Sequence, residues 1–230
     1  MITYTDSNEE HFLEKLASKL GRPTPGKIPT RHISGPPDFW TKTQPSQDEL
    51  LQQFIANAER LTVKCQLISN KNDIQSTIGG WISEIKAKSI ICWDSPELKQ
   101  ASIPDICQNL GLNLTLWNHQ ADRREMIRQC ANVDVGITWA DYGVANTGSM
   151  AILSNPVQSR AVSLLPPVHI AILKRETILP HMGDIFTKLD YTDLPSSLTF
   201  ITGPSRTSDI EMDLALGVHG PAKVFILILG

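Results

Sequence analysis

The sequence predicts an α/β fold, a Rossmann-like and mostly parallel sheet with helices on both faces, and three observations support it. Strand-length apolar runs alternate with amphipathic stretches through the middle of the chain, which is the pattern of βαβ units. Short apolar runs of this kind are typical of strands that are buried on both faces. The 230 residues are 41% hydrophobic, so the chain can bury a large core without disulfide bonds or metal ions.

Residues 1–45 are expected to form an N-terminal helix and a proline-rich arm, apart from a main domain over residues 46–230. Apolar residues at helical spacing predict a helix over Ser7–Leu20, which Gly21 ends. Proline removes a backbone donor and fixes φ, so Arg22–Pro45 is expected to be an extended arm lying on the domain or on a partner.

The main domain is expected to begin with a capping box, because Ser46 and Glu49 can exchange hydrogen bonds at a helix start. Further helices are expected over Ile74–Ile85, Glu97–Leu110 and Ala121–Cys130. Strands are expected between them at Cys65–Ile68, Ile90–Trp93, Leu112–Trp117 and Val133–Thr138. Right-handed crossovers would then give a doubly wound layer.

The second half of the chain departs from this alternation. Only a loop separates the apolar runs Met150–Leu153 and Val168–Leu173, which suggests adjacent strands or a hairpin extension. The remaining elements are expected to be a helix at about Ile178–Leu189, a strand at Leu198–Thr202, a helix at Asp209–Leu216 and a strand at Lys223–Leu229.

Charge and hydropathy exclude several classes of protein. The net charge is −3 and no long basic stripe is present, so no nucleic-acid partner is expected. Arg123-Arg124 and Lys174-Arg175 are isolated pairs, which are typical of solvated surface. No apolar run approaches the ~20 residues of a membrane span, and Met1–Glu10 lacks the pattern of a secretory signal, so a cytoplasmic location is expected.

The four cysteines are dispersed among apolar neighbours and lack the close spacing of an iron–sulfur or zinc site: Cys65, Cys92, Cys107 and Cys130. We therefore expect buried free thiols, and no metal or cofactor held by this chain.

The sharpest candidate site is the loop Gly203–Asp209, which follows an expected strand. A second capping box, Ser208 to Glu211, would start a helix there. In a parallel sheet such a loop lies at the carboxyl edge, where ligands bind, and free amides at a helix start favour an anion. The residues expected to face this anion are Gly203, Ser205, Arg206, Thr207, Ser208 and Asp209. The alternative is an ordinary connection in which Arg206 pairs with an acidic neighbour.

Three further candidates stand elsewhere in the sequence. The turn Thr147, Gly148, Ser149 has small and hydroxyl side chains that permit close approach of a ligand, although a tight turn with Asn146 or Gly148 at positive φ explains it equally well. Arg160 could reach an anion, and His219 could act as a ligand, although solvated or structural roles are commoner for such residues. His169 opens an apolar strand and is expected to be structural.

Known catalytic motifs are missing. The sequence has no dinucleotide or Walker loop, no nucleophile elbow and no zinc-protease motif. The aspartates are dispersed, so spacing assigns no acid–base pair.

Several stretches in combination match a known family: Thr147-Gly148-Ser149, Arg160 with Leu164–Ile170, Gly203–Glu211, Gly217–Pro221, and the opening Phe12-Leu13 and Leu20–Arg22. Together they resemble the LUD domain family of lactate utilization proteins, over nearly the whole chain. Members often carry an acidic residue just before the Thr-Gly turn, where this sequence has Asn146. A neutral amide cannot act as a carboxylate nucleophile, which argues against transferase-like chemistry there.

The resemblance implies a fold like that of ribose-5-phosphate isomerase, glucosamine-6-phosphate deaminase and the CoA transferases. It also implies an accessory subunit that works beside two iron–sulfur proteins in oxidising L-lactate to pyruvate. The iron–sulfur clusters would belong to those partners, and the anion would be a small carboxylate such as lactate or pyruvate.

Two other functions stay open at the level of sequence. The chain could be an independent enzyme acting on a sugar phosphate or an acyl-CoA, in which case the isolated protein would turn such a substrate over. It could also be a non-catalytic binding module that docks through Arg22–Pro45, in which case deleting that arm would weaken association while the core stays folded.

Overall fold

The computed structural model of the chain describes residues 6–22, 45–70, 72–208, 214–216 and 219–230. These residues belong to two compact units, Met1–Gln44 and Pro45–Gly230. In the first unit, α1 (Asp6–Lys19) confirms the predicted helix, and Gly21 follows it at φ 68°. Most of the predicted arm, residues 23–44, lies outside the described residues.

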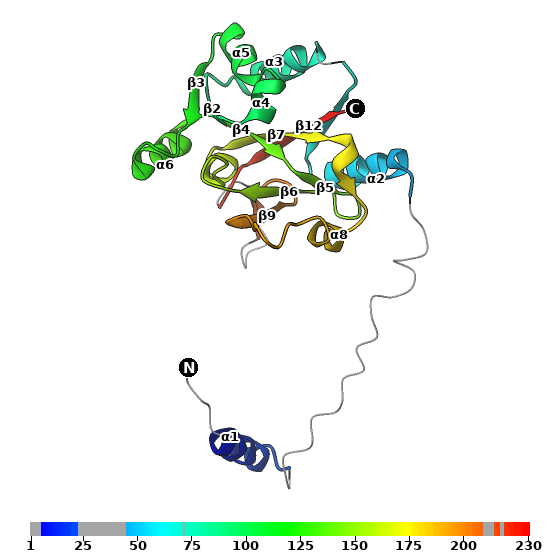
Figure 1. Cartoon of the computed structure of the whole chain (residues 1–230), viewed down its shortest axis with the longest axis vertical. Helices are drawn as coiled ribbons and strands as arrows, with labels where there is room; N and C mark the ends of the chain where they lie inside the picture. The colour runs from blue at the N-terminus through cyan, green and yellow to red at the C-terminus, as the bar shows by residue number, and fades with distance from the viewer. Residues whose placement is uncertain (1–5, 23–44, 71, 209–213, 217–218) are drawn as a thin grey trace. The chain divides into compact units, whose positions relative to one another are not determined.

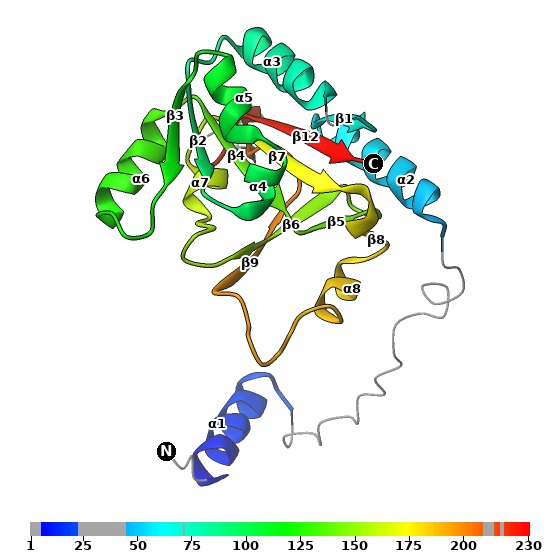
Figure 2. The same ribbon diagram turned by 45° about the horizontal axis from the view of Figure 1, so that its top comes forward.

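The second unit is built on a six-stranded parallel sheet, which confirms the predicted fold class. Its strand order is β1-β12-β7-β4-β2-β3. The bounds are β1 (Lys64–Ile68), β2 (Ser89–Trp93), β3 (Asn113–Trp117), β4 (Val135–Ala140), β7 (Val168–Lys174) and β12 (Lys223–Leu229). Figure 2 shows β7 and β12 side by side and pointing the same way. β4 is buried along its whole length, as a strand covered on both faces must be.

Helices cover both faces of this sheet. One face carries α3 (Asp73–Ile85), α4 (Pro96–Gln100) and α5 (Ile103–Asn109), which lie together on one side in Figure 1. On the other side lie α2 (Gln47–Arg60), α6 (Arg123–Asn132) and a second sheet. The short α7 (Ala161–Leu164) contacts α6 and β4. Gly136 of β4 lets α7 pack close, since a Cβ there would stand 1.9 Å from the Val162 carbonyl oxygen.

The second sheet has four strands in the order β8-β5-β6-β9. Its strands are β5 (Tyr142–Val144), β6 (Ser149–Ser154), β8 (Ile178–Leu179) and β9 (Ser197–Ile201). β6 pairs antiparallel with β5 and with β9. The prediction that Met150–Leu153 and Val168–Leu173 form adjacent strands is therefore wrong, because β6 and β7 belong to different sheets.

The capping box at the start of α2 is confirmed. The Ser46 hydroxyl accepts a hydrogen bond from the Glu49 amide, and Glu49 Oε2 accepts one from the Ser46 amide at 2.8 Å. Leu50, Leu51, Phe54 and Ala58 are the buried residues of the helix. They place α2 against the second sheet and β1, where its C-terminal end helps to form the site described below.

Three predicted helices differ from the observed elements. Glu97–Leu110 is divided into α4 and α5, where Ser102 has φ 56° and a proline opens α5. Ile178–Leu189 contains β8 and a short α8 (Met182–Phe186), because Pro180 interrupts the helical stretch. The last residues of the predicted helix Asp209–Leu216 form a strand instead, β11 (Leu214–Leu216), which pairs antiparallel with β10 (Arg206–Ser208).

The core between these layers is continuous and almost wholly apolar, with Phe54 and Trp93 among its largest buried side chains. His169 of β7 is fully buried, and its Nε2 lies 2.8 Å from Thr138 Oγ1 of β4. Burial lowers the pKa of His169 to about 3, so the ring is neutral, as a structural histidine should be. No helix in the described ranges is both long and apolar enough to cross a membrane.

Candidate functional site

The predicted site residues lie in two separate places. One group surrounds the C-terminal end of α2, and it consists of Thr147, Gly148, Ser149, Gly203, Ser205, Arg206 and His219. Arg160 instead lies near Ser154, at the opposite end of β6, where both residues line a cavity. Thr207 and Ser208 belong to β10, and Asp209 lies outside the described residues.

The Thr147–Ser149 turn docks on α2. Gly148 has φ 63°, and a Cβ there would stand 2.3 Å from the Ala58 amide nitrogen. The Asn57 side-chain amide donates a 2.8 Å hydrogen bond to the Ala145 carbonyl oxygen beside the turn. Only glycine permits this approach, so helix packing accounts for the residue at this position.

The hydroxyl groups of this turn bond to one another. Ser149 is fully buried, and its hydroxyl donates to Thr147 Oγ1 at 2.8 Å and lies 2.7 Å from Thr202 Oγ1. These hydrogen bonds join the turn to Thr202, which directly follows β9. It satisfies the buried hydroxyl without a ligand.

Arg206 is also occupied by the protein. Its Nη2 donates hydrogen bonds to the Leu61 carbonyl oxygen at 2.7 Å and to Thr62 Oγ1 at 2.9 Å. Carbonyl groups at the end of a helix lack intrahelical partners and carry negative partial charge, so the guanidinium stabilises the end of α2. Arg206 therefore does not pair with an acidic neighbour among the described residues, which was the alternative considered from the sequence.

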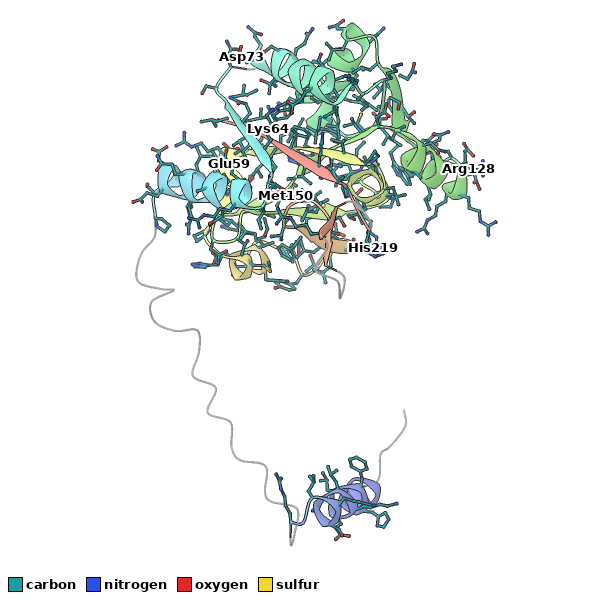
Figure 3. The ribbon with its side chains drawn as sticks, turned by 180° about the vertical axis from the view of Figure 1, so that it is seen from behind. Glu59, Lys64, Asp73, Arg128, Met150 and His219 are labelled. Atoms are coloured by element: carbon teal, nitrogen blue, oxygen red, sulfur yellow. The ribbon has the colours of Figure 1, made fainter. Side chains whose placement is uncertain are left out.

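The remaining residues of this loop support it from within. The Ser205 amide donates to the Pro221 carbonyl oxygen at 2.8 Å, and the Ser205 hydroxyl accepts from the His219 amide at 3.4 Å. His219 is exposed at the surface, where it is labelled in Figure 3.

Two parts of the predicted anion loop are therefore wrong. β9 belongs to the antiparallel second sheet, so the loop does not follow a strand of the parallel sheet. Residues 206–208 pair antiparallel with residues 214–216, so the end of the helix predicted over Asp209–Leu216 is a strand, and residues 209–213 lie outside the described residues. Serine and aspartate bond to nearby backbone in turns as well as at helix starts, which is why the pattern misled.

An open cavity of about 470 Å³ lies at the carboxyl edge of the parallel sheet. Its wall begins with Trp117, the last residue of β3, and continues through the loop after it. The described residues that line it are Trp117, Asn118, His119, Ala121, Arg123, Ser154, Asn155, Pro156, Ser159, Arg160, Ser196 and Ser197. Ligands of open α/β sheets bind at this edge, so the cavity is the favoured site of the fold.

Two tryptophans at strand ends hold the loop that carries Arg160. Trp93 Nε1, at the end of β2, donates to the Ser159 carbonyl oxygen at 2.9 Å. Trp117 Nε1, at the end of β3, donates to the Pro156 carbonyl oxygen at 3.0 Å. The rigid sheet therefore positions this wall of the cavity.

The cavity is positively charged. Arg123 and Arg160 contribute their guanidinium groups, and none of the described residues lining it is Asp or Glu. Within the described part of the chain, neither guanidinium forms an ion pair or a hydrogen bond. Ser154 is only 4% exposed, and its hydroxyl has no hydrogen-bond partner there. An unpaired buried hydroxyl is costly, so a partner supplied at the cavity, an ordered water or a ligand atom, would satisfy it.

The charges of two carboxyl groups, Asp141 and Glu97, interact near the point where the strand order reverses between β2 and β4. Burial raises the pKa of Asp141 to about 6, the Leu153 amide opposes the rise, and the charge of Glu97 adds to it. Asp141 Oδ2 accepts a 2.7 Å hydrogen bond from the Leu153 amide, and Leu153 directly precedes Ser154 in the sequence. Glu97 Oε2 is buried and has no partner within the described residues.

The thiol groups are free, and Cys92, Cys107 and Cys130 are buried while Cys65 is partly buried. Burial raises the pKa of Cys92 to about 12 and that of Cys107 to about 11. They are therefore protonated at neutral pH.

The sequence reasoning identified Arg160 but missed Arg123, Ser154 and the Glu97–Asp141 pair. The polar run Asn118–Gln120 directly follows a parallel strand and precedes a helix. Ligands bind at loops that follow parallel strands, and this rule, used in the prediction for Gly203–Asp209, also points to Asn118–Gln120. No local pattern could have joined Glu97 to Asp141, because the fold alone brings them together.

Comparison with known proteins agrees with this fold. Residues 51–229 match the LUD domain. "Lactate utilization protein C" of Halalkalibacterium halodurans is 31% identical over 229 residues, covering 96% of this chain and 96% of that protein. The protein of that name in Geobacillus sp. is 32% identical, covering 100% of this chain and 98% of that one.

A solved structure of a DUF162 family protein from Deinococcus radiodurans has a TM-score of 0.58 to this chain. It covers 81% of this chain and 100% of that one at 17% identity, so it is informative about the fold alone. With the match over residues 51–229 and full-length relatives above 30% identity, the chain belongs to the LUD domain family.

Proposed function

We propose that the chain serves L-lactate utilization as an accessory subunit that binds the carboxylate of lactate or pyruvate. The observation that carries the proposal is the cavity. Within the described residues it combines two unpaired guanidinium groups with a buried hydroxyl that has no partner, and no carboxylate lines it. The names of the full-length relatives supply the substrate class.

Arg160 and Ser154 are the groups assigned to the carboxylate. A guanidinium can donate two parallel hydrogen bonds to a carboxylate, which fixes the orientation of a small acid. The Ser154 hydroxyl would donate to the same ion or to its C2 oxygen, and this bond would satisfy the buried group. The anion site predicted from sequence at Gly203–Asp209 is thereby replaced, since Arg206 is held by α2.

Electron transfer is assigned to partners. We expect two iron–sulfur proteins of the same system to carry the clusters, because the thiols of this chain are dispersed and three of the four are buried. Thiolates, not thiols, ligate iron, and the raised pKa values of Cys92 and Cys107 oppose their ionisation.

Calorimetric titration of the isolated chain with pyruvate and with L-lactate tests the binding step. Arg160→Gln should weaken binding about tenfold or more, the value expected for loss of a charge-assisted hydrogen bond. Arg124→Gln is the matched control, because Arg124 is exposed on the same helix as Arg123 but does not line the cavity. Equal weakening by both variants would show a general charge effect and contradict the site.

A second measurement tests the division of labour. The isolated chain, supplied with L-lactate and an artificial electron acceptor, should produce no pyruvate. Sustained lactate oxidation by the chain alone would overturn its assignment as an accessory subunit.

A further inference from the structure

The cavity has more room than one lactate ion fills. Lactate is far smaller than the drug-sized ligands that cavities of roughly 300–1,000 Å³ usually hold. This cavity measures about 470 Å³. Its described lining includes no Val, Leu, Ile, Met or Phe, so no such side chain is there to receive the methyl group of lactate.

Two hydroxyl groups face each other across neighbouring strands at the wall of the cavity. Ser154 of β6 and Ser197 of β9 are opposite one another in the register of the second sheet, and both line the cavity. Figure 2 shows these two strands side by side. Residues directly opposite in an antiparallel pair lie on one face, with Cβ atoms roughly 5 Å apart. Ile152, two residues before Ser154 on that face, is fully buried, so the core ends and the cavity begins at the two serines.

The protein itself uses neither of these hydroxyl groups. Ser154 is 4% exposed, and its hydroxyl has no partner within the described part of the chain. The Ser197 hydroxyl forms no hydrogen bond to any described residue. The neighbouring Ser196 differs, because its hydroxyl donates to the Ser154 carbonyl oxygen at 2.7 Å and holds the backbone there. The two free hydroxyls are therefore fixed in place and open to ligand oxygens.

We propose that the cavity binds a 2,3-dihydroxy carboxylate, with the carboxylate at Arg160, the C2 hydroxyl at Ser154 and the C3 hydroxyl at Ser197. The carboxylate contact rests on the proposed function, whereas the contact with the diol rests on the strand register. A serine hydroxyl both donates and accepts, so two adjacent serines can bind the two adjacent oxygens of a diol. L-Glycerate is the smallest such acid with the configuration of L-lactate, and it differs from L-lactate only by a hydroxyl at C3. Lactate would place its methyl group against Ser197 and leave that hydroxyl without a ligand partner.

Calorimetric titration of the full chain with L-lactate and with L-glycerate compares two ligands that differ by this one hydroxyl. L-Glycerate should bind about fivefold more tightly, the value expected for one additional hydrogen bond. Ser197→Ala should abolish this preference and leave the affinity for L-lactate nearly unchanged. Thr199→Val is the matched control, because Thr199 belongs to the same strand and does not line the cavity. This control variant should keep the preference for L-glycerate.

Ser154→Ala tests the other half of the hydroxyl pair. It should weaken the binding of both acids about fivefold, because both carry the C2 hydroxyl. Thermal unfolding should show that Ser154→Ala is no less stable than the parent chain, since the hydroxyl that it removes has no partner among the described residues. A clear loss of stability would show a structural role and contradict the assignment of Ser154.

Equal affinity of the parent chain for the two acids would overturn the inference, and so would a preference that Ser197→Ala retains. In either case the carboxylate site stands if Arg160→Gln still weakens the binding of both acids. If L-glycerate is preferred through Ser197 while Arg160→Gln changes neither affinity, the carboxylate assignment fails and the diol contact stands. Failure of both acids to bind would overturn both assignments.

Discussion

Folding changes the pKa of Asp141, which directly follows β4 at the carboxyl edge of the parallel sheet. Its ordinary pKa of 3.8 is raised to about 6, chiefly by burial. The folded chain therefore holds this proton at pH values where the unfolded chain has released it. The stabilisation is complete below pH 3.8 and is lost as the pH rises through about 6.

Asp141→Asn should remove this pH dependence. The amide oxygen can still accept from Leu153 N, and the side chain cannot ionise. The free energy of unfolding of the variant, relative to the parent chain, should therefore rise by about 2 kcal/mol between about pH 4 and about pH 7. Urea denaturation at both pH values measures the difference.

Asp134→Asn is the control for this measurement. The Lys88 amide lowers the pKa of Asp134 from its ordinary 3.8, so Asp134 is mostly ionised in both states at pH 4 and fully ionised at pH 7. Its variant should show a nearly constant difference between the two pH values. The same constant difference for Asp141→Asn would contradict the raised pKa.

Elements position the site through contacts at their ends. The sheet ends at Trp93 and Trp117, whose indole nitrogens hold the loop before α7. The end of α2 is held by Arg206, and the start of α6 lies at the cavity wall. Apart from Trp117 and Ser154, the described side chains that line the cavity are at least partly exposed, so its geometry depends on these anchors.

Trp117→Phe should loosen the Arg160 loop without changing any charge. Loss of one hydrogen bond to the Pro156 carbonyl oxygen costs about 1 kcal/mol, or about fivefold in pyruvate affinity if the loop then moves. Calorimetric titration measures the change. Trp81→Phe is the control, because Trp81 is buried in the core against Phe225, with ring centroids 5.1 Å apart. Trp81→Phe should reduce stability and leave pyruvate affinity unchanged. Equal pyruvate affinity of the parent chain and Trp117→Phe would show that the hydrogen bond from Trp117 does not position the Arg160 loop.

How far the sequence predicts these elements depends on their length and partners. The parallel strands and α2, α3 and α6 carry their periodicity within their own residues, and they were predicted within a few residues. β5 and β8 are three and two residues long, too short for a local pattern. β10 and β11 exist because they pair with each other, and a local capping pattern pointed to a helix instead. The cavity joins residues 117–123, 154–160 and 196–197, a set that only the folded chain brings together.

At the scale of the whole molecule, the chain is a LUD domain preceded by a helix, with a charged cavity at the ligand-binding edge of its parallel sheet. The core and the buried thiols belong to a stable scaffold. Among the described residues that line the cavity, the guanidinium groups of Arg123 and Arg160 and the Ser154 hydroxyl have no partner. The proposed carboxylate-binding role uses groups of this cavity and none from the core.

The most direct test is L-lactate consumption by a strain that lacks only this gene, complemented with the parent chain, Arg160→Gln or Arg124→Gln. We expect the deletion to stop consumption, the parent chain and Arg124→Gln to restore it, and Arg160→Gln to fail at equal protein level. Unchanged consumption in the deletion strain, with no paralogue present, or full restoration by Arg160→Gln, would contradict a carboxylate-binding role in L-lactate utilization.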